Sequence, residues 1–236
     1  MATRILYTSP SVEIRFQNDS YSIVALTDLD VGTLVLIEHV FSGNKIDMHA
    51  LLFMDDDLRK ALYPRYAEDD MLDSEKNHEK ITMNAFQFGD DMVIGSGVCK
   101  FNHACKPNAY LTMVDNVEKI KFYGAFIVAR VKAGDEITLD YFNGHAEFHD
   151  SMMAQHGLSC SCTQESFAKS RARARIELNL ASRFRKAQED TINTHVDHHL
   201  AKHGREIARF QKEIRRFAAK NIQLCPAPDS RSRLRK

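Results

Sequence analysis

The sequence lacks any run of about eighteen apolar residues, which is the length that a membrane-spanning helix needs. Its first residues also lack the long apolar stretch of a secretory signal peptide. No internal repeat is present. These absences argue against helical membrane spans and against secretion, so we expect an intracellular protein of the cytosol or nucleus, without membrane partners.

Cysteine is scarce, with five among 236 residues. In a reducing compartment cysteines stay as thiols, so metal binding is a better interpretation of them than disulfide bonds. Apolar residues nevertheless make up 44% of the chain, which is enough for a core. The sequence therefore predicts one sizeable domain with an appendage, or two small domains.

The chain also lacks net charge, yet its charges are unevenly distributed. Residues 168–236 hold 18 lysines and arginines against 7 aspartates and glutamates. The preceding 167 residues hold 14 against 25. Oppositely charged parts indicate two roles, or one part that docks on the other.

The apolar pattern alternates between strand-like and helix-like segments. Strands are predicted at 12–16, 21–26, 34–40, 120–130 and 137–139, with turns at 30–32 and 133–135. Between them, residues 44–90 are predicted to be an acidic helical insertion with helices near 50–53 and 58–66. Beyond residue 162, helical spacing returns over 168–186 and 190–222.

The basic helical part allows several interpretations. Its arginine clusters are typical of contacts with nucleic acid or acidic proteins, but a solvated face packed on the acidic body is favoured, because aromatics for base stacking are absent. His195 and His199 have the four-residue spacing of helical metal pairs, although a surface histidine cluster is the favoured interpretation. The apolar stripe of these helices is also compatible with a homo-oligomer.

The most informative segment reads Asn-His-Ala-Cys-Lys-Pro-Asn, at residues 102–108. Proline fixes its own φ and disfavours helix for the residue before it, so the segment is predicted to be an irregular loop that presents side chains. Taken alone, it is also typical of an ordinary polar turn.

Two further motifs follow in order. Residues 133–142 read Ala-Gly-Asp-Glu-Ile-Thr-Leu-Asp-Tyr-Phe, and a Cys-Ser-Cys triplet stands at 160–162. Together the three motifs resemble the SET-domain family of protein lysine methyltransferases, in particular its members with a long inserted segment and a Cys-x-Cys post-SET segment. The resemblance covers about residues 8–165.

The resemblance implies a mainly β SET fold of several small curved sheets with a knot-like C-terminal part. Residues 1–165 would form the SET domain, with the helical insertion at about 44–90 and a short post-SET segment. Residues 166–236 would form a basic helical region that ends in a flexible tail.

The resemblance also implies S-adenosylmethionine-dependent transfer of a methyl group to a lysine side chain of a histone or another basic protein. Tyr141 would be the catalytic tyrosine, and it would also touch the cofactor. The other cofactor-binding residues would be Ser20, Tyr21, Ser22, Asn102 and His103. Phe86, Tyr110 and Phe142 are candidates for the apolar channel of the lysine, although each is equally typical of an ordinary core aromatic.

One zinc ion is a further expectation from the family. Its ligands would be Cys105, Cys160 and Cys162, completed by Cys225. The family's remaining segment cysteine is replaced here by Phe167, so His145, His149 and His156 are alternatives for the fourth ligand. Without zinc, the cysteine pair would be a remnant.

A second departure concerns residues 20–22. The family carries a Gly-x-Gly turn there, and this chain has Ser-Tyr-Ser. Two alternatives to the enzyme therefore stand: an inactive SET module that serves as a binding or scaffold protein, and a SET fold reused for another reaction on a small molecule.

Overall fold

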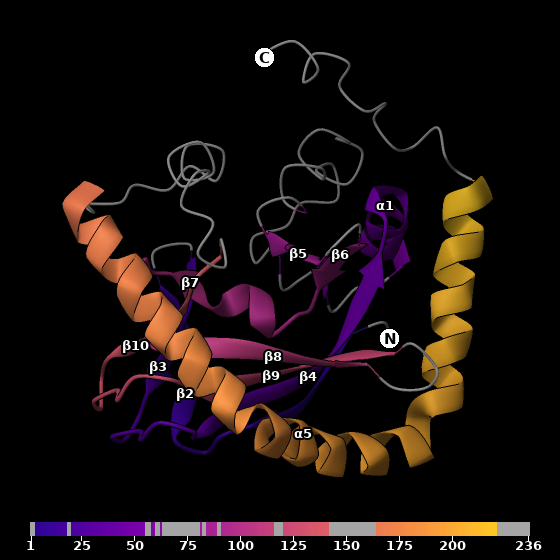
Figure 1. The fold of residues 1–236 in the computed structure, drawn as a ribbon. Coiled ribbons are helices and arrows are strands. Elements are labelled where there is room, and N and C mark those ends of the chain that lie inside the picture. Colours follow the sequence, from indigo (N-terminus) through magenta and orange to yellow (C-terminus); the bar gives the residue numbers. More distant parts are fainter. Residues whose placement is uncertain are drawn as a thin grey trace.

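The computed structural model describes residues 3–17, 20–54, 58–59, 62, 81, 84–88, 91–115, 120–141 and 164–220. The strands are β1 (Arg4–Thr8), β2 (Val12–Gln17), β3 (Ser20–Ala25), β4 (Leu34–Gly43), β5 (Phe86–Phe88), β6 (Asp91–Ile94), β7 (Asn102–His103), β8 (Ala109–Asp115), β9 (Lys121–Ile127) and β10 (Glu136–Leu139). The helices are α1 (Lys45–Met54), the 3-10 helix η2 (Val98–Lys100) and α5 (Gln164–Lys220). Figure 1 shows the strands at the centre, with α5 running around them.

The larger sheet has the order β5-β6-β4-β9-β8, and β1 also pairs with β4. Its central strand, β4, is buried from its second residue to its last. Side chains alternate between the two faces of a strand, so β4 serves two cores. Leu36 and Val40 join the core on one face, and Ile37 joins the core beneath α5 on the other.

The smaller sheet has the order β2-β3-β10-β7. β2 and β3 form an antiparallel pair, and β10 joins β3 by Glu136–Val24 and Ile137–Ile23 pairs. The turns at Gly32 and Gly134 have φ values of 90° and 89°, a conformation that glycine adopts without a Cβ clash. The two predicted glycine turns are therefore confirmed.

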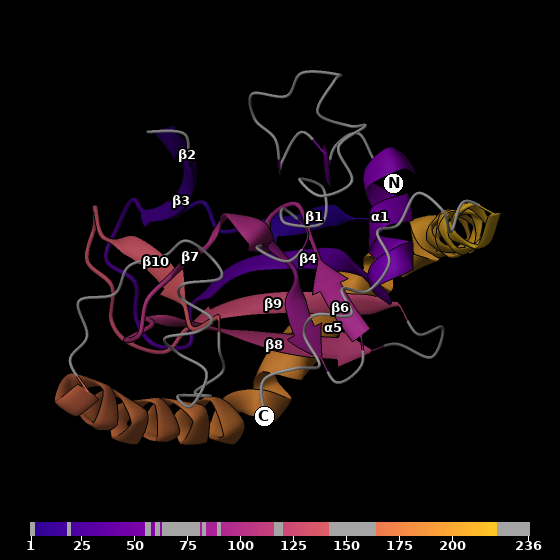
Figure 2. The same cartoon turned by 90° about the horizontal axis from the view of Figure 1, so that it is seen from above.

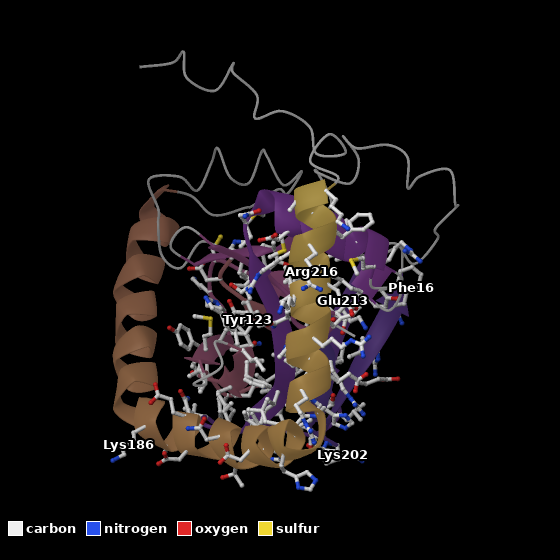
Figure 3. All side chains as sticks on the ribbon, turned by 90° about the vertical axis from the view of Figure 1, so that its right-hand side faces the viewer. Phe16, Tyr123, Lys186, Lys202, Glu213 and Arg216 are labelled. Atoms are coloured by element: carbon white, nitrogen blue, oxygen red, sulfur yellow. The ribbon has the colours of Figure 1, made fainter. Side chains whose placement is uncertain are left out.

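Helix α5 covers the outer face of the larger sheet. Figure 3 shows three runs of this helix, which meet near Lys186 and Lys202. Ile192, Val196 and Ile207 of α5 are buried against strands of that sheet. The hydroxyl of Thr112 lies 3.0 Å from Oε1 of Gln188, which gives β8 and α5 one buried polar contact.

The last run of α5 packs on α1, as Figure 2 shows from above. Ile214 and Ala218 share a buried cluster with Met48 and Leu51 of α1 and with Phe41 of β4. The helix thus joins the inserted segment to the sheet, and the apolar stripe seen in the sequence is used within the chain.

The predicted fold class, a mainly β SET-type fold with a helical insertion and a helical C-terminal region, is confirmed in these elements. Two details differ. Phe86–Phe88, placed inside the helical insertion, is a strand that pairs with β6. The two helices predicted at 168–186 and 190–222 are one continuous helix, whose part from Ile192 to Ala218 packs on the sheet and on α1. The division at residue 165 stays a prediction, and the path beyond Tyr141, on which the knot-like part depends, lies outside the described residues until 164.

No helix among the described ranges is both long and apolar enough to cross a membrane. The outer side of the last run of α5 is exposed and mainly basic. Its exposed cations are Lys202, Arg205, Arg209, Lys212, Arg215, Arg216 and Lys220.

Candidate functional site

The parallel pairing of β7 and β10 brings the two main sequence motifs together. Thr138 is paired with Asn102, and Leu139 with His103. The backbone N–H of Ala104 donates to the carbonyl of Leu139 at 2.9 Å. β10 ends two residues before Tyr141, so the tyrosine follows directly on the strand that pairs with β7.

Tyr141 is held by its hydroxyl, its backbone and its ring. The hydroxyl donates to the backbone carbonyl of Phe101, and the backbone N–H donates to Nδ1 of His103 at 3.2 Å. The ring lies 5.3 Å from the ring of His103 and meets Phe86 edge-on at 5.8 Å. Burial raises the pKa of Tyr141, and the charges of Cys99 and Glu136 raise it further, so the phenol keeps its proton.

The contacts of His103 define its tautomer. Nδ1 accepts the backbone N–H of Tyr141, so in the neutral ring the proton is on Nε2. Nε2 lies 3.4 Å from Sγ of Cys105, and this geometry makes the sulfur an acceptor. His103 therefore links the tyrosine to the cysteine of the same loop.

Asn102 joins three strands through its side-chain amide. Nδ2 donates to the carbonyl of Tyr21 at 2.9 Å and to Oε1 of Glu136 at 2.6 Å. The ammonium group of Lys100 lies 4.9 Å from the centre of the Tyr21 ring. The structure thus brings together Tyr21 and Asn102, two of the residues predicted to bind a cofactor.

The Ser-Tyr-Ser segment at 20–22 is the beginning of β3. Ser20, Tyr21 and Ser22 are paired with residues 17, 16 and 15 of β2, so their backbone is extended. Any L-residue adopts this conformation, and glycine is not required for it. Ser20 is exposed and Ser22 is half-buried. The replacement of Gly-x-Gly therefore introduces no backbone strain here.

Asn108, the last residue of the 102–108 motif, clamps β10 to the loop. Its Nδ2 donates to the carbonyl of Glu136 at 2.8 Å, and its Oδ1 accepts the N–H of Thr138 at 2.9 Å. Its own carbonyl accepts the N–H of Val128 at 2.8 Å. This residue sets the position of the strand that leads to Tyr141.

The predicted channel residues separate in the structure. Phe86 contacts Tyr141, as described above. Tyr110 is paired across the sheet with Phe126, which packs beneath α5. Paired residues share a face, so Tyr110 lies on the α5 side, away from Tyr141, and the structure does not bring it to the site. Phe142 lies outside the described residues.

The predicted zinc ligands fall mostly outside the described part of the chain. Cys160, Cys162 and Cys225 lie there, as do the alternatives His145, His149 and His156. Within the described ranges, no three histidines, cysteines or carboxylates are grouped as a metal site would need. Cys105 is half-buried and lies in the loop described above. Zinc therefore stays a prediction.

Two residues beside the site were not singled out from the sequence. Tyr123 is fully buried, and its ring meets Phe86 edge-on at 6.2 Å. Glu38 is fully buried in β4, where its carboxylate accepts the backbone N–H groups of Gly97 and Val98. A lone carboxylate inside the apolar run 34–41 was the available signal.

The chain is similar to three sets of known proteins. A family model described as the SET domain matches residues 20–142, just over half of the chain. A protein of Acanthamoeba polyphaga mimivirus described as SET domain-containing is 21% identical over 146 residues, which cover 58% of this chain and 46% of that protein. The chain thus spans about half the length of that relative.

A crystal structure from Plasmodium falciparum, provisionally described as a histone methyltransferase, has a TM-score of 0.35 and 12% identity to this chain. The similarity covers 56% of this chain and 94% of that one. At this TM-score it carries no argument about the reaction.

Proposed function

Because the chain belongs to the SET-domain family, we propose that it transfers a methyl group from S-adenosylmethionine to a lysine side chain of a protein. The observation that carries the proposal is the position of Tyr141, whose hydroxyl donates to the Phe101 carbonyl beside the motif loop. The half-buried ring of His103 lies 5.3 Å from the Tyr141 ring, and the half-buried Asn102 precedes His103 in β7.

The polar groups around Asn102 fit the proposed cofactor. Lys100 offers a cation beside the Tyr21 ring, and Asn102 contacts both the Glu136 carboxylate and the carbonyl of Tyr21. These groups match the carboxylate, ammonium and hydroxyl groups of S-adenosylmethionine. In the proposal Tyr21, Asn102 and His103 hold the cofactor, with Ser20 and Ser22 at the edge of β3. The bound cofactor supplies a methyl group activated by a sulfonium centre.

Tyr141 has the role of orienting the reacting amine. Its proton is directed to the Phe101 carbonyl, so the lone pairs of the phenol oxygen can accept a hydrogen bond from a lysine amine. The raised pKa of Tyr141 keeps this arrangement fixed at neutral pH. The rings of Phe86 and His103 shield one side of the phenol from water, which strengthens the orienting hydrogen bond.

The substrate class follows from charge. Residues 1–167 carry 25 acidic against 14 basic residues, which favours encounter with a basic protein such as a histone. Zinc bound by Cys105 with Cys160, Cys162 and Cys225 is part of the proposal as a structural ion, and no chemical step depends on it. The metal content of the purified protein, with and without Cys105→Ser, tests this ion.

The decisive experiment measures transfer of labelled methyl groups from S-adenosylmethionine to core histones and to cell lysate. Tyr141→Phe removes one hydroxyl, and we expect transfer to fall by about 100-fold. Tyr110→Phe is the matched control. It also removes one phenol hydroxyl, but from the face of the larger sheet that points to α5 and away from Tyr141. Equal transfer by both variants would contradict the role of Tyr141.

A wild-type protein that is folded but transfers no label would contradict the methyltransferase. Titration calorimetry with the cofactor then separates the alternatives. Absence of cofactor binding favours the binding module, and binding without transfer to protein favours a reaction on a small molecule.

A further inference from the structure

A buried carboxylate lies behind the candidate site and belongs to none of the predicted roles. Glu38 is in the centre of β4 and has no exposed surface. It alternates with Ile37 and His39, which face α5, so its side chain points to the opposite face, where Leu36 and Val40 pack. An acidic residue in such a position is rare unless its oxygens are fully bonded.

Both oxygens of Glu38 act as acceptors. Oε1 accepts the Ser96 hydroxyl at 2.9 Å and the Gly97 N–H at 2.9 Å. Oε2 accepts the Gly97 N–H at 2.9 Å and the Val98 N–H at 2.8 Å. Burial raises the pKa of Glu38, while these hydrogen bonds act to lower it. Both oxygens thus serve as acceptors for the Ser96 hydroxyl and for two backbone N–H groups, which is an arrangement that stabilises a carboxylate.

Two glycines allow the chain to wrap this carboxylate. A Cβ at Gly95 would lie 2.6 Å from Oε2 of Glu38, and a Cβ at Gly97 would lie 3.0 Å from it. Neither φ is in the left-handed region, so close approach is the reason for glycine at both positions. The Gly-Ser-Gly segment at 95–97 is therefore shaped around Glu38.

The wrapped segment continues directly into the site. Helix η2 follows it, and the Lys100 N–H donates to the carbonyl of Gly97 at 3.0 Å. Phe101 comes next, with its side chain fully buried and its carbonyl accepting the Tyr141 hydroxyl. A shift of the segment would therefore move the acceptor of the phenol.

We propose that Glu38 is a positioning residue of the methyl-transfer site: it fixes the 95–98 segment and, through it, the Phe101 carbonyl that orients Tyr141. This inference rests on the proposed function. Glu38 itself touches neither Tyr141 nor any predicted cofactor residue, so its effect is transmitted through the backbone.

The test compares Glu38→Gln and Ser96→Ala with the wild-type chain. Glutamine has the same shape as glutamate, but its amide group points N–H donors at the N–H donors of the backbone. The 95–98 segment must therefore shift. Ser96→Ala removes one donor at a half-buried position and leaves the hydrogen bonds of the Gly97 and Val98 N–H groups in place. We expect methyl transfer to fall by about 100-fold in Glu38→Gln and by a smaller factor in Ser96→Ala.

Ile192→Ala is the control for stability, because Ile192 of α5 packs on the outer face of the larger sheet, in a cluster that does not include Tyr141. Its expected result is a lowered melting temperature with unchanged turnover per folded molecule. An equal loss of turnover in Ile192→Ala and Glu38→Gln at matched stability would overturn the positioning role.

A second readout is independent of activity. With 3-fluorotyrosine incorporated, the Tyr141 signal in fluorine NMR is assigned as the one missing in Tyr141→Phe. The proposal expects this signal to shift in Glu38→Gln and, less, in Ser96→Ala, but not in Ile192→Ala. Wild-type protein without methyl transfer would overturn the proposed function alone, and an unshifted signal in the folded variants would overturn the role of Glu38. If Glu38→Gln does not fold, the test rests on Ser96→Ala. An unshifted Tyr141 signal together with a wild-type rate of methyl transfer in Ser96→Ala would then overturn the role of Glu38.

Discussion

Ile192 of α5 packs directly over Gly124 of β9, and a Cβ on that glycine would lie 2.5 Å from the Cδ1 atom of the isoleucine. The missing side chain is what lets the helix approach the sheet. The same approach brings Gln188 of α5 within 3.0 Å of Thr112.

A bulky residue at position 124 is therefore expected to push α5 from the sheet. Gly124→Val should lower the free energy of unfolding by about 2 kcal/mol, since overpacking forces side chains from their rotamers. Urea unfolding measures the change. In the double variant with Ile192→Ala the loss should be smaller than the sum of the single losses, and strict additivity would show that the two residues do not meet.

Asn108→Asp tests the clamp on β10. The substitution keeps the shape but replaces the Nδ2 donor by an oxygen that faces the Glu136 carbonyl. We expect a loss of about 1–3 kcal/mol in unfolding free energy, because an acceptor then meets an acceptor. The same change at the exposed Asn193 is the matched control and should alter stability little. Similar losses at both positions would argue against the clamp.

The buried His39 and the half-buried His199 predict a pH-dependent stability. Within the described part of the chain, neither ring nitrogen of His39 has a hydrogen-bond partner. Burial, followed by the charge of His199, lowers the pKa of His39 from 6.5 to about 3. Burial, followed by the charge of His203, lowers the pKa of His199 to about 4. In the unfolded chain both would take up protons near pH 6.5, so the unfolded state binds more protons below that pH.

The free energy of unfolding is therefore expected to be highest above pH 6.5 and to fall as the pH drops towards the pKa values of the folded state. For His39 the expected slope is about 1.4 kcal/mol per pH unit. Denaturant unfolding at pH 7, 6 and 5 measures it. His39→Leu should flatten the curve and be neutral or stabilising at pH 7, whereas His198→Leu, at an exposed position, should leave the slope intact.

The two left-handed glycines allow a test of backbone strain alone. Nothing lies within 4 Å of a Cβ built on Gly32 or Gly134. A substitution there therefore causes no steric clash with neighbours, and its cost comes from the positive φ alone. Each change to alanine should lower the unfolding free energy by about 1 kcal/mol. Asparagine, which tolerates this conformation, should lower it less. Equal losses for alanine and asparagine would point to another cause.

The sequence predicted the site where the chemistry was local and missed it where the partners were distant. The family's motifs predict that Asn102, His103 and Tyr141 touch one cofactor, and the pairing of β7 with β10 places the 102–108 and 133–142 motifs side by side. Glu38 was missed because its partners are backbone N–H groups about sixty residues further along the chain. The identity of a residue in the sequence does not reveal which distant backbone groups will bond to it.

Two differences between the sequence-based expectations and the structure have similar physical origins. Phe86–Phe88 is a strand only because β6 pairs with it, and three residues carry too little pattern to predict that pairing. Tyr110 was grouped with Phe86 as an aromatic near the motif. Its neighbours Leu111 and Met113 face the core with Tyr141, so the alternation along β8 places Tyr110 on the other face.

The path of α5 also has a consequence for how the chain folds. Tyr7 of β1 meets His195 of α5 with their rings 5.2 Å apart, although they stand near opposite ends of the described chain. Contacts of such long sequence separation form late, since the loop between them must close first. Until Ile214 and Ala218 have been synthesised, the apolar side chains of α1 and β4 that they cover are exposed to solvent. Truncation within α5 is therefore expected to expose these surfaces and to lead to aggregation rather than to a smaller folded domain.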